Sequence, residues 1–171
     1  NVLVDGLRTL FQSSELDFRS IIIRNVGRYG YNIAGSDGFF YNCQVNSAGS
    51  DGWHFVVGSN HLAMCSTFSC GGYGVSIATS ATFITMVGAD IDKSSFDNFH
   101  ILADDTSLIG CVSRDPGQAA TNIYSHVDLG SAGTKNGVVL VGTRYRPPLL
   151  GNTAVYLVRC NSQLFNSQLE I

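Results

Sequence analysis

A short apolar–polar–apolar segment recurs along the chain about every 22 residues, and this spacing constrains the fold more than any other feature. The steps between the apolar residues that end the copies are 22, 22 and 24 residues: Ile33, Phe55, Ile77 and Ile101. A second column has steps of 22, 21 and 25 residues: Cys43, Cys65, Met86 and Cys111. Self-similarity at a fixed period of roughly 20–50 residues is the signature of a solenoid. The repeat therefore predicts one structural unit stacked on itself.

The composition limits the class of protein. The chain has 171 residues, of which 44% are apolar and only 13% are charged, so it suits one globular domain and not a disordered segment. No apolar run approaches the roughly 18 residues of a membrane span. The net charge is −3 and no basic cluster occurs, so we expect neither nucleic-acid binding nor membrane insertion. Because the chain begins at Asn1, we expect it to be a piece of a longer protein.

The period and the turn residues together predict an all-β, single-stranded parallel β-helix. Short β-rich runs alternate with turns rich in Gly, Ser, Asn and Asp, as at 35–38 and 49–52. A step of 22 to 25 residues allows about six to seven coils in this length. We expect residues 17–171 to form the β-helix domain, with an irregular, loop-bearing coil at about 113–150. Residues 144–148 are expected to leave the stack as an extended loop.

Residues 1–16 differ from the repeats, and two interpretations are open. Val4, Leu7, Leu10 and Phe11 have helical spacing, so the segment is either a short helical cap or an entry strand.

Five cysteines favour buried thiols over a metal site. Cys43, Cys65 and Cys111 share a core column, which we expect Cys160 to join, and free cysteine behaves as a small buried hydrophobe. Adjacent strands lie about 4.8 Å apart, which also leaves a Cys43–Cys65 disulfide open. No Cys-x-x-Cys pair occurs, so no zinc site is predicted.

Three segments carry a family resemblance: 37–43 (DGFFYNC), 51–55 (DGWHF) and 70–75 (CGGYGV). They resemble right-handed parallel β-helix proteins of the pectate-lyase-like superfamily, most of all the branch of bacteriophage tailspikes and related bacterial surface proteins. The resemblance covers roughly residues 17–113. It implies a carbohydrate ligand, a homotrimer, and a location in the virion tail or at the bacterial cell surface.

The polar members of the repeated segment form the first candidate site. Each lies between two apolar residues of a strand and must point outward, in one stripe: Asn32, His54, Ser76 and His100, continued by His126. Such a stripe suits hydrogen bonds to sugar hydroxyls or an interface between chains, and an ordinary solvated strand face is the alternative. No carboxylate lies between the histidines in sequence, so we expect no metal.

Asp90 and Asp92 form the second candidate site. Alternate carboxylates of an extended segment share one side and lie about 6.5–7 Å apart, near the separation found in inverting glycosidases. Lys93 leaves a lyase open, with Ca²⁺ on the carboxylates as the only cofactor to consider. The alternative is a solvated turn.

Aromatic residues invite a sugar-stacking interpretation, which the repeat restricts. Trp53 occupies an inward position beside Phe55, so we expect it in the core, and Tyr73 is open to either role. Exposed aromatic candidates are Tyr29, Tyr41 and Tyr145.

These observations leave three hypotheses: a structural and glycan-recognising segment of a tailspike-like or surface fibre protein, a polysaccharide hydrolase or lyase using Asp90 and Asp92, and a purely architectural spacer.

Overall fold

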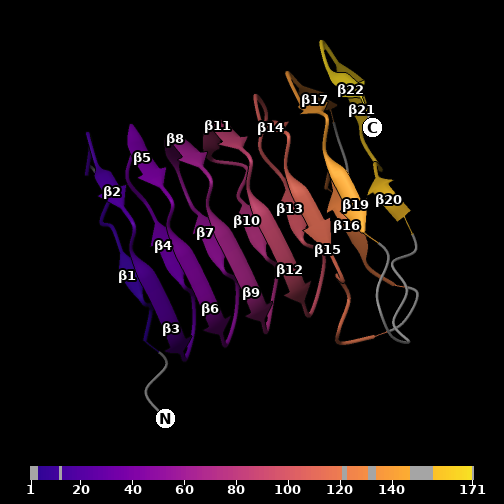
Figure 1. The fold of residues 1–171 in the computed structure, drawn as a ribbon. Coiled ribbons are helices and arrows are strands. Elements are labelled where there is room, and N and C mark those ends of the chain that lie inside the picture. Colours follow the sequence, from indigo (N-terminus) through magenta and orange to yellow (C-terminus); the bar gives the residue numbers. More distant parts are fainter. Residues whose placement is uncertain (1–3, 12, 121–122, 131–133, 147–155, 171) are drawn as a thin grey trace.

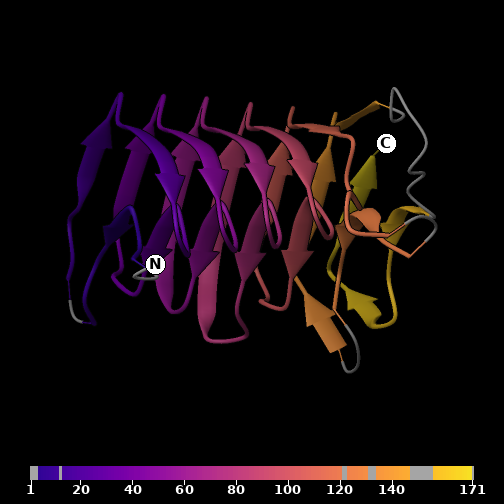
Figure 2. The same ribbon diagram turned by 90° about the horizontal axis from the view of Figure 1, so that it is seen from below.

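The computed structural model is an all-β solenoid, and it describes residues 4–11, 13–120, 123–130, 134–146 and 156–170. Its described residues contain strands and no helix, so an entry strand, not a helical cap, is found near the N-terminus. The coils lie side by side from the N-terminal to the C-terminal end (Figures 1 and 2). All strand pairs are parallel, as the repeat predicts.

Three long sheets run along the solenoid. Sheet A has seven strands: β1 (Leu7–Arg8), β4 (Tyr31–Ile33), β7 (Trp53–Phe55), β10 (Val75–Ile77), β13 (Phe99–Ile101), β16 (Ser125–Asp128) and β20 (Tyr156–Arg159). Sheet B also has seven: β2 (Asp17–Arg19), β5 (Gly38–Tyr41), β8 (Gly58–Ala63), β11 (Ala81–Val87), β14 (Ser107–Ile109), β18 (Val139–Val141) and β22 (Gln168–Glu170). Sheet C has six: β3 (Ile22–Val26), β6 (Gln44–Ala48), β9 (Ser66–Cys70), β12 (Asp90–Ser94), β15 (Val112–Arg114) and β19 (Arg144–Arg146).

The regular part of the solenoid has about five turns, fewer than the six to seven coils expected. The difference arises after β15, where longer connections interrupt the repeat (Figure 2). Two strands outside the long sheets, β17 (Thr134–Asn136) and β21 (Gln163–Phe165), pair with each other there. Arg144–Arg146 does not leave the stack, because β19 pairs with β15. Residues 147–148 of the expected loop lie outside the described residues.

The inward columns of the three sheets form one continuous core. In sheet A, Tyr31 stacks on Trp53 with ring centroids 3.9 Å apart, and both side chains are fully buried. The expected core position of Trp53 is therefore confirmed. In sheet B, Phe40, Leu62, Met86 and Leu108 follow one another in register. Burial of these large side chains is the main force that holds the coils together.

The cysteine column is corrected in two places. The residues that follow the sheet B strands in register are Cys43, Cys65, Ala89 and Cys111, because the Ser66 amide bonds the Cys43 carbonyl and the Asp90 amide bonds the Cys65 carbonyl. Met86 belongs to the neighbouring column of Phe40. Cys160 does not join the column either: it is exposed and follows β20 of sheet A. All five thiols are free, so the Cys43–Cys65 disulfide is not formed.

The glycine that precedes most sheet A strands is required by packing. A Cβ on Gly74 would clash with the side chain of Ile91 in sheet C and with the Asn98 carbonyl of the next coil. Gly6, Gly30 and Gly52 meet sheet C side chains in the same way. This close contact between sheets A and C fixes the backbone of the corner that carries the candidate site.

Among the described residues, no helix reaches the length and hydropathy needed to cross a bilayer.

Candidate functional site

The predicted polar stripe lies on the outward side of sheet A. Asn32, His54, Ser76 and His100 are direct neighbours on successive strands. The next position is Asp128, because His100 pairs with Asp128 in the register of β13 and β16. The placement of His126 in the stripe is wrong. The longer connection between β15 and β16 moves the register by two residues relative to the expected spacing.

Two tyrosines cover the two histidines of the stripe. Tyr29 stacks on His54, with ring centroids 4.4 Å apart and an interplanar angle of 8°. Tyr73 stacks on His100 with 4.3 Å and 8°. Each tyrosine precedes a sheet A strand by two residues and contacts the histidine of the following coil. The stripe is therefore a series of repeated tyrosine–histidine pairs, with half-buried rings.

Aspartates at the same corner connect consecutive coils. Asp51 Oδ2 lies 3.2 Å from His54 Nδ1, and Asp51 Oδ1 accepts a hydrogen bond of 3.0 Å from the Tyr73 amide. Asp5 has the same place one unit earlier, where it accepts bonds from the Arg28 guanidinium and the Asn32 side chain. The bonds from Arg28 are the main reason that the pKa of Asp5 falls to about 2. These carboxylates order the corner and orient the stripe.

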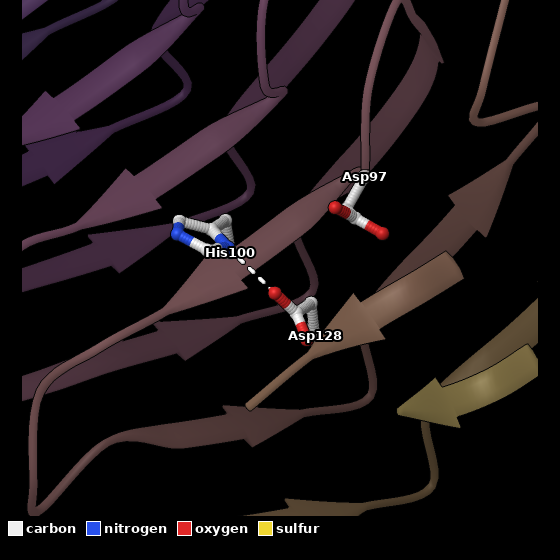
Figure 3. Close-up of side chains that lie close together, drawn as sticks. All are labelled: Asp97, His100 and Asp128. Atoms are coloured by element: carbon white, nitrogen blue, oxygen red, sulfur yellow. Dashed lines mark hydrogen bonds and ion pairs between the residues drawn. The ribbon is translucent and has the colours of Figure 1, made fainter. Parts of the chain in front are cut away.

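The last unit gathers Asp97, His100, Asp128 and Arg159 (Figure 3 draws the first three). His100 Nδ1 lies 2.8 Å from Asp128 Oδ2, and the Arg159 guanidinium donates to Asp128 at 2.9 Å and to Asp97 at 3.3 Å. Burial would raise the pKa of Asp128, but the bonds from His100 and Arg159 lower it to about 2. Burial raises the pKa of Asp97, and the Ser125 amide and Arg159 offset only part of this effect.

Two carboxylates and an imidazole are a donor set that suits a divalent cation. One ligand atom from each of Asp97, His100 and Asp128 lies within 4.8 Å of the others. Arg159, however, bridges the two carboxylates and already supplies a positive charge there. A metal would have to displace this guanidinium, so the residues present fit a charge-balanced hydrogen-bond network better than a metal site.

The chemistry of the stripe lies in the outer nitrogen of each histidine. The carboxylate beside Nδ1 favours the tautomer that carries hydrogen on Nδ1, which leaves Nε2 as an acceptor in the neutral ring. Among the described residues, no hydrogen bond engages Nε2 of His54 or His100. In Figure 3 the second ring nitrogen of His100 points away from Asp128. The two side chains retain 24% and 16% of their exposure, enough for a ligand hydroxyl to reach a ring edge.

His126 belongs to a buried polar network instead. Its Nδ1 lies 2.8 Å from Ser113 Oγ, which also accepts a 2.8 Å hydrogen bond from the Asn98 amide group. Burial lowers the pKa of His126 to about 4, so the ring is neutral near pH 7. Ser113 and His126 have the residue types of a nucleophile and its base, but both are buried, and no substrate reaches them. Their role is structural.

Asp90 and Asp92 lie on the outward side of sheet C, as their alternation predicts, with Ile91 in the core between them. Arg114 binds Asp90 through two hydrogen bonds, of 3.0 and 2.7 Å, and approaches Asp92 at 3.8 Å. Burial raises the pKa of Asp92, and Arg114 offsets part of this effect. The two carboxylates thus have different surroundings. Lys93 lies over the Phe68 ring, 5.0 Å from its centroid.

Tyr41 is exposed on sheet B, as expected, whereas the expected exposure of Tyr145 is wrong, because its hydroxyl is buried and its ring packs against the core.

The sequence carries a signal for the stacked units that a single-coil period misses. Asp5, Asp51 and Asp97 are 46 residues apart in each step, and Tyr29 and Tyr73 are 44 apart, so aspartate and tyrosine alternate at one corner position. A search for a two-coil period finds these residues. It does not find Arg159, whose contact with Asp97 depends on the irregular coil between them.

Comparisons of the chain with protein-family models, with curated proteins and with solved structures found no match.

Proposed function

We propose that this chain is a structural and glycan-recognising segment of a surface fibre, in which the outward stripe of sheet A binds a polysaccharide. The observation that carries the proposal is the pair of tyrosine-covered histidines, His54 and His100, each with its Nδ1 beside a carboxylate. A β-solenoid is compatible with surface polysaccharide binding and with fibre roles.

The spacing of the two histidines supports an extended ligand. They lie two strands apart in sheet A, which corresponds to about 9.6 Å at the usual strand separation. Two fixed acceptors at this distance, on a rigid sheet, suit a polymer whose hydroxyls recur along its length. Orientation of each ring by a carboxylate reduces the entropy lost on binding. Protein and polysaccharide would then run along the same axis.

The resemblance of residues 37–43, 51–55 and 70–75 to tailspike-type β-helix proteins supports the same assignment. On this proposal the parent protein is a tailspike-like or bacterial surface protein of the pectate-lyase-like superfamily, located in the virion tail or at the cell surface. The homotrimer that this resemblance implies stays a prediction.

A panel of purified capsular and O-antigen polysaccharides, with binding measured by affinity electrophoresis, tests the proposal. The double variant His54→Ala, His100→Ala is expected to lose binding at least about tenfold, because it removes both outward acceptors. His61→Ala is the matched control, since His61 is an exposed histidine on sheet B. If the wild-type chain binds no member of the panel, the proposal is wrong and the architectural spacer is favoured.

The different surroundings of Asp90 and Asp92 favour one second candidate, a polysaccharide-cleaving activity. Asp92, with its raised pKa and an Oδ1 atom that has no hydrogen-bond partner among the described residues, suits the general acid. Asp90, held by Arg114, suits the base. Under the lyase alternative Lys93 would be the base and Ca²⁺ the cofactor.

The double variant Asp90→Asn, Asp92→Asn separates this candidate from binding alone. The wild-type chain would release reducing ends or unsaturated products from a bound polysaccharide, and the variant would bind the polymer but release neither. Binding without any product from the wild-type chain contradicts the enzymatic candidate and leaves the binding proposal intact.

A further inference from the structure

The outward face of sheet B is apolar, unlike the outward faces of the other two sheets. Phe39, Tyr41, Val87 and Ile109 expose 39%, 46%, 44% and 40% of their surface on it. Contiguous exposed apolar surface of this kind marks an interaction site more often than an ordinary solvated face does. The polar stripe of sheet A and the charged side chains of sheet C do not extend onto it.

The strand register arranges this face as two outward columns. The first column is Asp17, Phe39, His61, Thr85, Ser107, Val139 and Gln168. The second is Arg19, Tyr41, Ala63, Val87, Ile109, Val141 and Glu170. Each column contains one residue from every strand of the sheet.

The polarity of each column is the same from either end. The first column is polar at its ends and over its three central positions, with Phe39 and Val139 as apolar residues placed symmetrically between them. The second column is apolar over its five central positions and ends in opposite charges, Arg19 and Glu170. The centre of this pattern is the strand β11, which carries Thr85 and Val87.

From this pattern we infer that sheet B is the interface of a two-fold symmetric dimer in which a second copy of this chain packs face to face with its solenoid axis reversed. A two-fold axis through β11 then brings Phe39 against Val139 of the second copy and Val87 against its own equivalent. Arg19 meets Glu170 of the second copy at both ends of the interface. Such an isologous contact requires a self-complementary surface, which this face provides.

A parallel arrangement of two copies fits this face less well. With the two-fold axis along the solenoid, the first column of one copy would face the second column of the other. Val87 would then meet Thr85, and Ile109 would meet Ser107, so the apolar residues of the centre would lose their apolar partners. The reversed arrangement keeps apolar residues together and opposite charges together, which favours it over the parallel one.

Sedimentation velocity of the full chain from about 1 to 100 μM tests the inference. The wild-type chain is expected to sediment as a dimer in the upper part of this range. Val87→Lys places two like charges at the two-fold axis and is expected to give a monomer throughout. Ile22→Lys is the matched control, because Ile22 is an aliphatic residue with 48% exposure on sheet C, and this variant should dimerise normally. Circular dichroism verifies that both variants are folded.

Charge reversal tests the direction of the second copy. Arg19→Glu and Glu170→Arg are each expected to weaken the dimer roughly 3- to 30-fold, and the double variant is expected to restore it. A wild-type monomer or trimer at the highest concentration, or a dimer of Val87→Lys as stable as that of the wild type, overturns the inference. Single reversals that the double variant does not rescue overturn the reversed orientation.

Discussion

Asn98 occupies a corner position that glycine holds in the four preceding coils. Its side chain points into the core and donates hydrogen bonds to the Ile91 carbonyl, the Ser113 hydroxyl and the Arg114 carbonyl. The larger side chain fits because sheet C has the small Ser113 where the earlier coils have larger side chains such as Ile91. One exchange of volume between two sheets thus replaces an apolar contact by a buried polar network.

That network makes stability depend on pH through His126. Burial lowers its pKa from 6.5 to about 4 in the folded chain, so the unfolded chain binds the proton more tightly between these values. Stability is therefore full above about pH 6.5 and is lost as the pH falls towards 4, by roughly 2–4 kcal/mol. Urea unfolding of the wild type and of His126→Gln across this range measures the effect, and the variant should show a flatter profile. Equal slopes for the two proteins would contradict the assignment.

At the scale of strands, the irregular coils are held by side chains more than by the repeat. Arg159 of β20 contacts Asp128 of β16, Asp97 of the preceding corner and the Ile123 carbonyl. No equivalent residue bridges the regular coils, where the stacked apolar columns suffice. A single arginine therefore connects β20 to two earlier parts of the chain.

Arg159→Met is expected to destabilise β16 and β20 by roughly 2–4 kcal/mol, because it leaves the buried Asp97 carboxyl without its cationic partner. Hydrogen exchange of the amides in these strands measures the local loss. Arg24→Met on the exposed face of sheet C is the control and should change stability by less than about 0.5 kcal/mol. Unchanged protection of β16 and β20 would show that packing alone retains them.

The corner glycines make a second prediction for the strands. Gly74→Ala forces a methyl group against Ile91 and should cost about 1–3 kcal/mol of unfolding free energy, measured in urea. Gly110 has a positive φ of 61° but no atom near its Cβ position, so Gly110→Asn is the control and should be tolerated. A Gly74→Ala variant as stable as the wild type would mean that sheets A and C can separate without cost.

The elements that the sequence predicts correctly are those whose period is undisturbed. Stacked copies of one strand share an environment, so Trp53 and the stripe from Asn32 to His100 fall where the spacing indicates. The errors have local physical causes. Met86 is apolar and near the expected step, but only the backbone register shows that Ala89 is the true neighbour of Cys65. The connection before β16 shifts the register, which replaces His126 by Asp128.

At the scale of the whole molecule, four of the five cysteines lie inside the solenoid. Burial raises the pKa of Cys65 and Cys70 to about 12 and that of Cys111 to about 11, so these thiols are protonated at neutral pH. Cys160 is exposed. The reactivity of the native chain should therefore differ sharply from that of the unfolded chain.

Labelling with a maleimide, followed by mass spectrometry, should give one adduct on the native chain and five in denaturant. Cys160→Ser should remove the native adduct without changing stability by more than about 0.5 kcal/mol, because the side chain is exposed. Rapid native labelling at Cys43 or Cys65 would mean that the coils open far more readily than their packing indicates.

The alternation of aspartate and tyrosine at the corner of sheet A has a consequence for how such a chain can grow. Insertion of one extra coil of about 22 residues would preserve the three core columns, yet it would place two aspartates or two tyrosines on neighbouring coils. The tyrosine–histidine stacks survive only when coils are added or removed in pairs. The unit of lengthening for this molecule, in its evolution or in engineering, is therefore the double coil.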